Sequence, residues 1–215
     1  MQSSIVKKVL MALSGIFLMI FLLQHLSINL TSLIPDNGKT FNAISHFMGY
    51  NPIVQFVLQP ILIFGVFFHF AMGLVLEYEN RAARKQKYVY SNTRSSWISR
   101  NMIITGLVIL SFLILHFYDF WIPEIQYKYI DQSVHNSSKY FHELQEKFHG
   151  QTLRTILYCV SFILLGLHLN HGLSSSAQSV GAVKKENNRI RLFANIYSIA
   201  ITSGFILVAL YHYFA

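Results

Sequence analysis

Five long stretches of the chain are almost wholly apolar, and shorter polar segments separate them. A helix needs about 20 residues to cross a bilayer, and each stretch reaches that length. The predicted spans run roughly over Val9–Leu30, Pro52–Leu76, Ile98–Ile122, Thr152–Leu173 and Leu192–Tyr213. The pattern predicts an all-α, multi-pass membrane protein that forms a single domain over residues 1–215.

Smaller features refine this outline. The first span is too long for a signal peptide, and no small-residue cleavage site follows it. Pro60 is expected to kink the second span, which membrane helices tolerate. The segment Ile122–Gln151 is expected to be the longest outer loop, with a short interfacial helix over Ser138–Phe148.

The composition agrees with membrane insertion. Hydrophobic residues make up 53% of the chain and charged residues only 12%, whereas a soluble domain carries about 25% charged residues. So much apolar surface also excludes a disordered chain. One cysteine excludes a disulfide framework, a cysteine-held iron–sulfur cluster, a cysteine-based zinc site and a covalently tethered haem. No nucleic-acid partner is expected.

The basic residues predict the orientation. Twelve of the 17 lie before span one, between spans two and three, or between spans four and five: Lys7, Lys8, Arg81, Arg84, Lys85, Lys87, Arg94, Arg100, Lys184, Lys185, Arg189 and Arg191. By the positive-inside rule the N-terminus is cytoplasmic and the C-terminus is outside. This face serves topology and contact with anionic lipid, or it serves as a docking platform for soluble subunits.

Ten histidines are unusual in so apolar a chain, because an ionisable residue within a span is expensive and usually functional. Spans one to four each contain one, and these are His25, His69, His116 and His168. The others are expected at surfaces: His46 in an outer loop, His135, His142 and His149 solvated, and His212 at the membrane interface.

Depth separates the four span histidines into two levels. His25 lies 18 residues after Lys7 and His116 lies 18 residues after Ile98, both in outward-running spans, so at about 1.5 Å per residue both are near the outer face. His69 and His168 lie toward the inner face. Two facing imidazoles at one depth of a bundle suit the axial positions of a haem iron. We therefore expect two haems, although a hydrogen bond to a carbonyl is the alternative for any single membrane histidine.

Spans one and three share a second feature. Each carries a hydroxyl residue and a glycine eleven and ten residues before its histidine, namely Ser14-Gly15 and Thr105-Gly106. These pairs are about 15 Å deeper than that histidine, at the level of the other haem. A missing side chain lets a flat macrocycle approach the backbone; small-residue helix packing is the alternative use.

Spans two and four share the pattern His-x-x-x-Gly-Leu, with Gly73 following His69 and Gly172 following His168. This match selects His168 as the ligand and leaves His171 as a residue of the haem environment. Spans one and two are thus predicted to be a tandem copy of spans three and four. A pseudo-two-fold axis along the membrane normal would relate them, with the fifth span added.

Two imidazoles per iron leave no open coordination position, so such haems carry electrons and do not bind oxygen. The outer loops offer no redox centre, which favours a small lipophilic partner such as a quinone. Asp119, Gln55 and Gln59 are the candidate quinone contacts at the outer level. Asp119 is equally consistent with a solvated interfacial residue.

The whole set of motifs resembles the dihaem cytochrome b membrane anchor of succinate dehydrogenase and fumarate reductase, in its single-chain, five-helix cytochrome b558 type. The resemblance covers nearly the whole chain. It rests on Ser14-Gly15, Gln24-His25, His69, Ser96-Trp97-(x)2-Arg100 before Thr105-Gly106, His116, and Leu167-His168 with Asn170-His171-Gly172-Leu173.

This resemblance implies two b haems, an outer, distal one on His25 and His116 and an inner, proximal one on His69 and His168. It implies cytoplasmic iron–sulfur and flavoprotein subunits that carry the dicarboxylate chemistry. It also implies menaquinone as redox partner, in the respiratory chain of a bacterial cytoplasmic membrane. One departure is Gly166, where some relatives carry a glutamate, so a proton path through such an acid is not supported.

Two other functions stay open. The chain could anchor another respiratory oxidoreductase, such as a hydrogenase, formate dehydrogenase or nitrate reductase. Those families more often place two ligands on one helix, which argues against them here. A haem-free proton-coupled transporter would need histidines at the midplane, and the two-level pattern argues against it.

Overall fold

The computed structural model describes residues 4–83, 102–131, 136, 138–183 and 187–215, and helices dominate this part of the chain, which contains no strand. Five helical stretches are long and apolar enough to cross a membrane: Ile5–Leu33, Val54–Ala82, Met102–Ile130, Thr152–Ser179 and Asn188–Phe214. The five predicted spans are thus confirmed.

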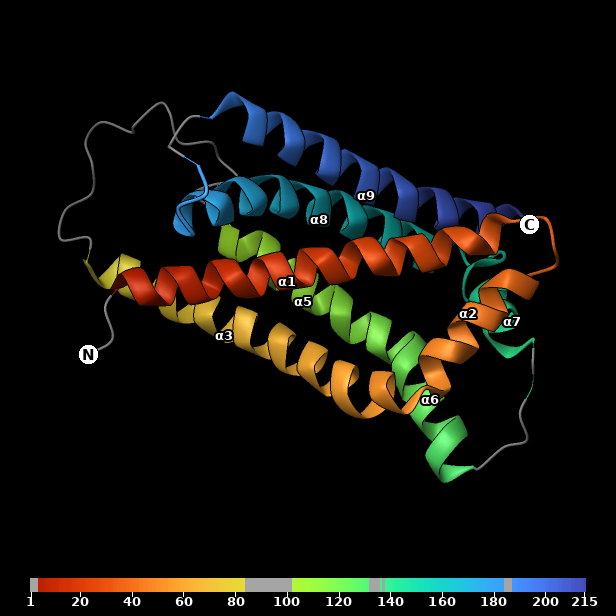
Figure 1. Ribbon diagram of the computed structural model, residues 1–215. Helices are drawn as coiled ribbons and strands as arrows, with labels where there is room; N and C mark the ends of the chain where they lie inside the picture. The colour runs from red at the N-terminus through yellow and green to blue at the C-terminus, as the bar shows by residue number, and fades with distance from the viewer. Residues whose placement is uncertain (1–3, 84–101, 132–135, 137, 184–186) are drawn as a thin grey trace.

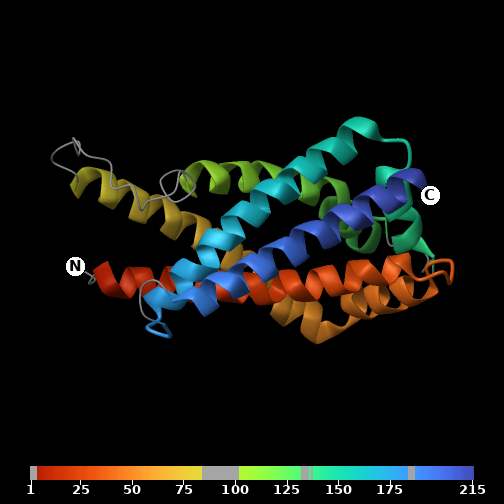
Figure 2. The ribbon, with the colours of Figure 1, turned by 90° about the horizontal axis from the view of Figure 1, so that it is seen from above.

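The long helices form an elongated bundle (Figure 1). They are α1 (Ser4–Leu30), α3 (Gln59–Ala83), α5 (Met102–His116), α8 (Thr152–Ser179) and α9 (Asn188–Phe214). Consecutive helices run in opposite directions, so α1, α5 and α9 share one direction (Figures 1 and 2). Contacts join α1 to α3, α3 to α5, α5 to α8 and α8 to α1. In this ring α1 lies diagonally opposite α5, and α3 opposite α8, while α9 packs outside against α8 and α1.

The structure differs from the prediction at the end of the bundle that holds α2 and α7. The third span does not stop at Ile122; it continues through η3 (Phe117–Trp121), α6 (Ile122–Ile125) and η4 (Gln126–Ile130). The expected loop over Ile122–Gln151 is therefore helical in its first third. The short helix expected over Ser138–Phe148 is present as α7 (Lys139–Phe148).

Charge pairing explains why the third span extends so far. Glu124 forms ion pairs with Lys128 one turn along the helix and with Lys139 of α7. The Tyr140 hydroxyl also donates to Glu124 at 2.8 Å. Burial, and then the nearby Glu124 carboxylate, raise the pKa of Tyr140 above its ordinary value. Charged residues of the segment that was expected to be a loop thus pair with each other between α6 and α7.

The sequence reading missed helix α2 (Lys39–Tyr50). Its start depends on Gly38, whose φ of 74° lies in the left-handed region. A Cβ atom there would also lie 2.2 Å from Cγ of Phe141, so only glycine lets α7 pack this closely. The Asp36 carboxylate accepts hydrogen bonds from the Thr40 amide and hydroxyl, at 2.9 and 2.6 Å.

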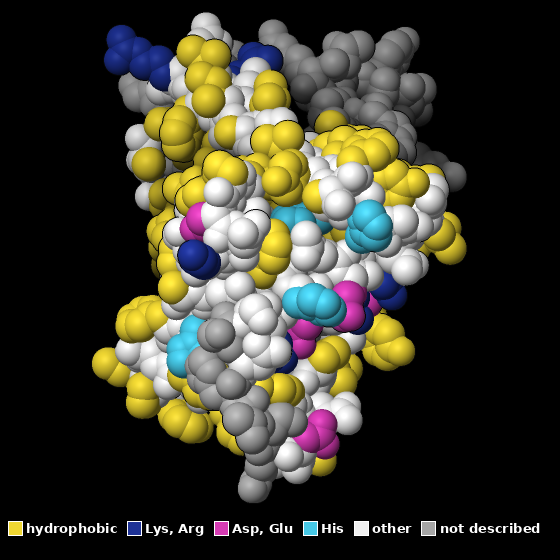
Figure 3. All heavy atoms as spheres, turned by 90° about the vertical axis from the view of Figure 1, so that its right-hand side faces the viewer, with side chains coloured by type: hydrophobic (Ala, Val, Ile, Leu, Met, Phe, Trp, Pro, Cys, Tyr) yellow, Lys and Arg dark blue, Asp and Glu magenta, His cyan; other side chains and the backbone are white. Residues whose placement is uncertain are grey.

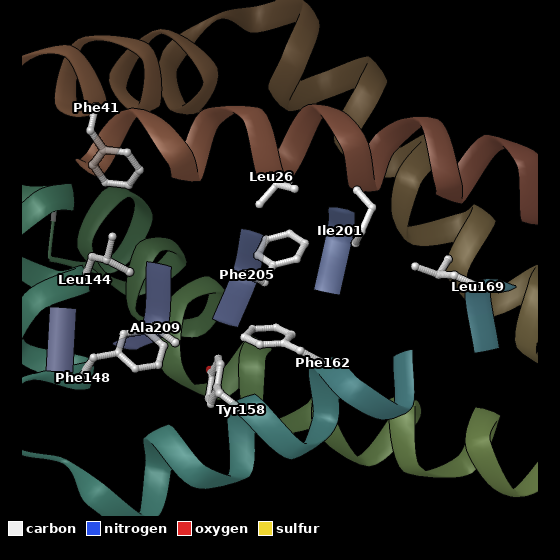
Figure 4. Packing of buried hydrophobic residues seen from close by; sticks show 10 residues of the cluster. All are labelled: Leu26, Phe41, Leu144, Phe148, Tyr158, Phe162, Leu169, Ile201, Phe205 and Ala209. Atoms are coloured by element: carbon white, nitrogen blue, oxygen red, sulfur yellow. The ribbon is translucent and has the colours of Figure 1, made fainter. Parts of the chain in front are cut away.

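A core in which half of the residues are aromatic lies between α1, α8 and α9 and under α2 and α7 (Figure 4). It consists of Leu26, Phe41, Leu144, Phe148, Tyr158, Phe162, Leu169, Ile201, Phe205 and Ala209. Many other large apolar side chains remain exposed, as expected for surfaces that face lipid. Figure 3 views the end of the bundle that carries α2 and α7. Charged and histidine side chains are visible near its middle, and hydrophobic side chains lie around them.

Several predicted features lie outside the described residues. These are the start of span three at Ile98, the Ser96-Trp97 and Arg100 motif, His135, and the basic residues Arg84, Lys85, Lys87, Arg94, Lys184 and Lys185.

Candidate functional site: two histidine pairs

The four span histidines meet in two pairs. His25 of α1 faces His116 of α5, with ring centroids 5.9 Å apart and an interplanar angle of 81°. His69 of α3 faces His168 of α8, with centroids 6.5 Å apart and an angle of 74°. Each pair joins diagonally opposite helices, so the rings meet across the middle of the four-helix ring. These are the two pairs that depth along the spans predicted.

The spacing within each pair suits one metal ion. A metal–imidazole bond is about 2 Å long, and each ring centre lies about 1 Å beyond its nitrogen, so two axial rings have centroids about 6 Å apart. Within the described residues no group of three or more His, Cys, Asp or Glu gathers that could hold a metal ion. A two-ligand iron needs equatorial ligands from elsewhere, and a haem macrocycle supplies them.

A hydroxyl group orients each ring of the inner pair. Ser14 Oγ lies 3.0 Å from His69 Nδ1, and Thr105 Oγ1 lies 3.1 Å from His168 Nδ1. Each hydroxyl also donates to the carbonyl three residues earlier, at 2.8 and 2.9 Å. Because a hydroxyl has a single hydrogen, it must accept from the ring Nδ1–H. That tautomer leaves Nε2 with a free lone pair for a metal.

The predicted depth of two glycines agrees with their contacts. A Cβ atom at Gly15 would lie 3.3 Å from His69 Cε1, and one at Gly106 would lie 3.9 Å from His168 Cε1. Both glycines therefore lie beside the inner pair, about 15 Å from the histidine of their own helix. The backbone of α1 and α5 approaches the inner rings without a side chain between.

Gly73 and Gly172 make a second matched set of contacts. A Cβ atom at Gly73 would meet Met11 Cε at 3.6 Å, and one at Gly172 would meet Met102 Cε at 3.5 Å. Both methionines lie three residues before the hydroxyl residues, at positions the sequence reading did not single out. Their flexible thioether side chains adapt readily to a neighbouring group.

Aromatic rings surround the outer pair. Phe21 stacks on His25 at 5.5 Å and 15°, and Phe112 stacks on His116 at 5.8 Å and 29°. These two phenylalanines are four residues before their histidines in the two repeats. Phe205 of α9 also approaches His25, at 5.7 Å. His116 Nδ1 is buried and has no hydrogen-bond partner among the described residues, so the hydrogen-bonding capacity of this ring is not satisfied within them.

The structure contradicts one of the two interpretations of Asp119, that of a solvated residue at the membrane interface. It is 1% exposed and lies in the π-helical turn η3, directly after His116. Tyr158 donates a hydrogen bond to its Oδ2 at 2.8 Å. Arg154 Nε lies 3.3 Å from Oδ2, and Lys147 Nζ lies 4.0 Å from Oδ1. π-turns are frequent at functional sites, and this one turns the carboxylate inward toward α8.

The two glutamines do not join this cluster. Gln55 donates to the Gly49 carbonyl and accepts from the Tyr129 hydroxyl at 3.2 Å, so its contacts are with α2 and η4. Gln59, the first residue of α3, is half-buried. None of the hydrogen bonds of Gln55 involves a residue that contacts Asp119.

Some of the remaining histidines occupy the positions expected for them. His142 is exposed and lies 3.3 Å from Glu146, and His149 is also exposed. His46 was expected in an outer loop, but it lies in α2, where it stacks on Tyr50 with centroids 4.3 Å apart. His171 is half-buried, one turn from His168.

His212 is an exception, because it is 0% exposed and therefore not at the protein surface, where it was expected. Its Nε2 lies 2.9 Å from Ser32 Oγ, and the Phe141 ring packs edge-on against it at 5.5 Å. Helix α7 folds over the end of α9, which the position of His212 at the end of its span could not reveal.

Gly166 has a packing role. A Cβ atom there would lie 2.1 Å from Thr202 Oγ1 and 3.3 Å from Thr202 Cβ. Helix α9 therefore fills the space that a larger side chain would need, and a glutamate cannot be accommodated at this position. The sequence showed that Gly166 replaces the glutamate of some relatives, but it did not show why.

Comparison of the chain with protein-family models, with curated proteins and with solved structures returned no match. The functional assignment therefore depends on the residues and contacts described above.

Proposed function

We propose that this chain is the membrane anchor and electron-transfer subunit of a succinate:quinone oxidoreductase, with two bis-histidine b haems. The observation that carries the proposal is the meeting of four histidines in two diagonal pairs, at 5.9 and 6.5 Å. Four polar residues in the apolar interior of a membrane bundle need a function that compensates for their burial.

Matched contacts in the two halves support a pseudo-two-fold bundle. Hydroxyl contacts at the inner rings, glycines beside those rings and phenylalanines stacked on the outer rings each occur twice, at equivalent sequence positions. Such duplication is expected where two similar helix pairs bind similar groups at two levels.

When bound, each haem supplies a one-electron carrier that is coordinatively saturated. The chain's residues do the rest. Histidine Nε2 atoms would hold the haem irons, Ser14 and Thr105 fix the ring tautomer at the inner level, and the aromatic core excludes water around the outer level. The two levels are about 15 Å apart along the helices.

In this proposal the N-terminus is cytoplasmic and the inner pair, His69 with His168, is nearest to an iron–sulfur subunit and its flavoprotein partner. The predicted positive charge of that face supplies the docking surface. The end of the bundle that holds the outer pair would be the one that meets menaquinone. Asp119 is the strongest of the three quinone candidates, because it is buried and ion-paired close to His116.

A reduced-minus-oxidised absorbance spectrum with a haem count per chain tests the haems directly. We expect b-type bands and two haems. His69→Ala and His168→Ala should lose the same haem, and His25→Ala and His116→Ala should lose the other. His149→Ala is the control, since this histidine is exposed and lies outside the spans, and it should retain both haems. Absence of b-type bands would refute the proposal.

The soluble partner needs a separate test. In membranes that contain the native complex, addition of succinate should reduce the haems, and fumarate should reoxidise them. Reduction by hydrogen or formate, but not by succinate, would identify an anchor of another respiratory enzyme.

A further inference from the structure

An apolar groove of about 350 Å³ opens between α1, α8 and α9, away from both histidine pairs. Its walls include Ile16 and Met19 from α1, Ala177 and Val180 from α8 and its end, and Phe193 and Tyr197 from α9. These residues belong to the middle of α1, the C-terminal end of α8 and the first turns of α9.

The groove offers hydrocarbon and no free polar group. Its one polar side chain is Tyr197, whose hydroxyl already donates to the Met19 carbonyl at 2.6 Å. Nothing else in the lining can pair with the carbonyl oxygens of a quinone ring or with a sugar. A bound molecule must therefore insert an apolar chain and keep its polar part outside.

Exposed positive charge lies beyond one end of this groove. Arg189 is exposed and precedes Phe193 by four residues, so it lies about 6 Å further along the same face of α9. Lys8 is exposed and precedes Met19 by eleven residues, which is three turns along the same face of α1. The two helices run side by side in one direction, so both cations are at one end of the groove.

We infer that this groove binds an anionic phospholipid, with one acyl chain between α1, α8 and α9 and the phosphate near Arg189 and Lys8. A hydrocarbon slot with cations at its mouth complements a lipid that carries net negative charge. This lipid would cover the gap between the fifth helix and the first. The inference concerns a different surface from the haem site and does not depend on it.

Native mass spectrometry of the full-length protein tests the site, with phosphatidylglycerol and phosphatidylcholine as the two probe lipids. We expect retention of phosphatidylglycerol over phosphatidylcholine. Arg189→Gln should weaken phosphatidylglycerol binding about fivefold, the contribution of one basic residue at a membrane surface. Arg191→Gln is the matched control, because Arg191 is also exposed but points about 200° away around α9.

A second pair of variants tests the slot without changing charge. Ala177→Phe fills the groove and should reduce retention of both lipids, whereas Ala200→Phe, on an exposed face of α9, should not. Equal effects of Arg189→Gln and Arg191→Gln, or unchanged binding in Ala177→Phe, would overturn the inference. So would retention of a quinone in place of phospholipid.

Discussion

Replacing Ser14 with alanine removes the oxygen that lies 3.0 Å from His69 Nδ1. The hydroxyl accepts a hydrogen bond from Nδ1–H, which makes the imidazole a more basic ligand and favours oxidised iron. We therefore predict that Ser14→Ala raises the midpoint potential of the inner haem and leaves the outer haem unchanged. Thr105→Ala should do the same through His168, because its hydroxyl makes the equivalent contact at 3.1 Å.

The size of the shift follows from the strength of one hydrogen bond. Such a bond contributes about 0.5–1.5 kcal/mol in a protein. For a one-electron couple 59 mV corresponds to about 1.4 kcal/mol, and only the part of the bond energy that differs between the two redox states changes the potential, so the shift is expected to be upward and no larger than about 60 mV. Both replacements together should give roughly the sum, since the two hydroxyls contact different rings.

Potentiometric titration of the α-band, with the two haems resolved, is the assay. Ser27→Ala is the control within α1, because that exposed hydroxyl bonds only to the Leu23 carbonyl of its own helix. Ser14→Thr should restore the native potential. A downward shift, or an equal shift of both haems, would refute the assignment of Ser14 to the inner ligand.

Three further outcomes follow from particular contacts. Asp119→Asn removes the buried charge that balances Arg154, and it should lower the free energy of unfolding by about 2 kcal/mol in a detergent titration; an unchanged value would contradict the ion pair. Gly166→Ala should destabilise by about 1–3 kcal/mol, and Thr202→Ala in the same chain should recover part of this loss, because it removes the oxygen 2.1 Å from the new Cβ. Hydrogen bonds from the Thr40 hydroxyl and amide hold the pKa of Asp36 below its ordinary value, so this carboxylate should stabilise the start of α2 at neutral pH and lose that effect as the pH falls through the lowered pKa. Amide exchange of Thr40 measured against pH checks it, and a profile unaltered by Asp36→Asn would contradict it.

The sequence alone determined the membrane class, the five spans and the pairing of the histidines. These follow from one-dimensional rules, because the length of an apolar run is compared with bilayer thickness and the depth of a residue is its helical rise. The tandem repeat added that Ser14 and Thr105 are equivalent positions. Their offset of eleven residues placed them at the level of the other histidine pair. It did not reveal that their hydroxyls contact the imidazole rings there.

Only the tertiary structure decided what lies around those positions. The burial and pairing of the Asp119 carboxylate depend on Tyr158, Arg154 and Lys147, which are distant in sequence and come from α7 and α8. His212 is buried because α7 folds over it, and Gly166 is glycine because α9 packs there. Burial and ion pairing are properties of neighbours in space. A pattern along one helix specifies which face turns inward, but not which side chains from other helices meet it.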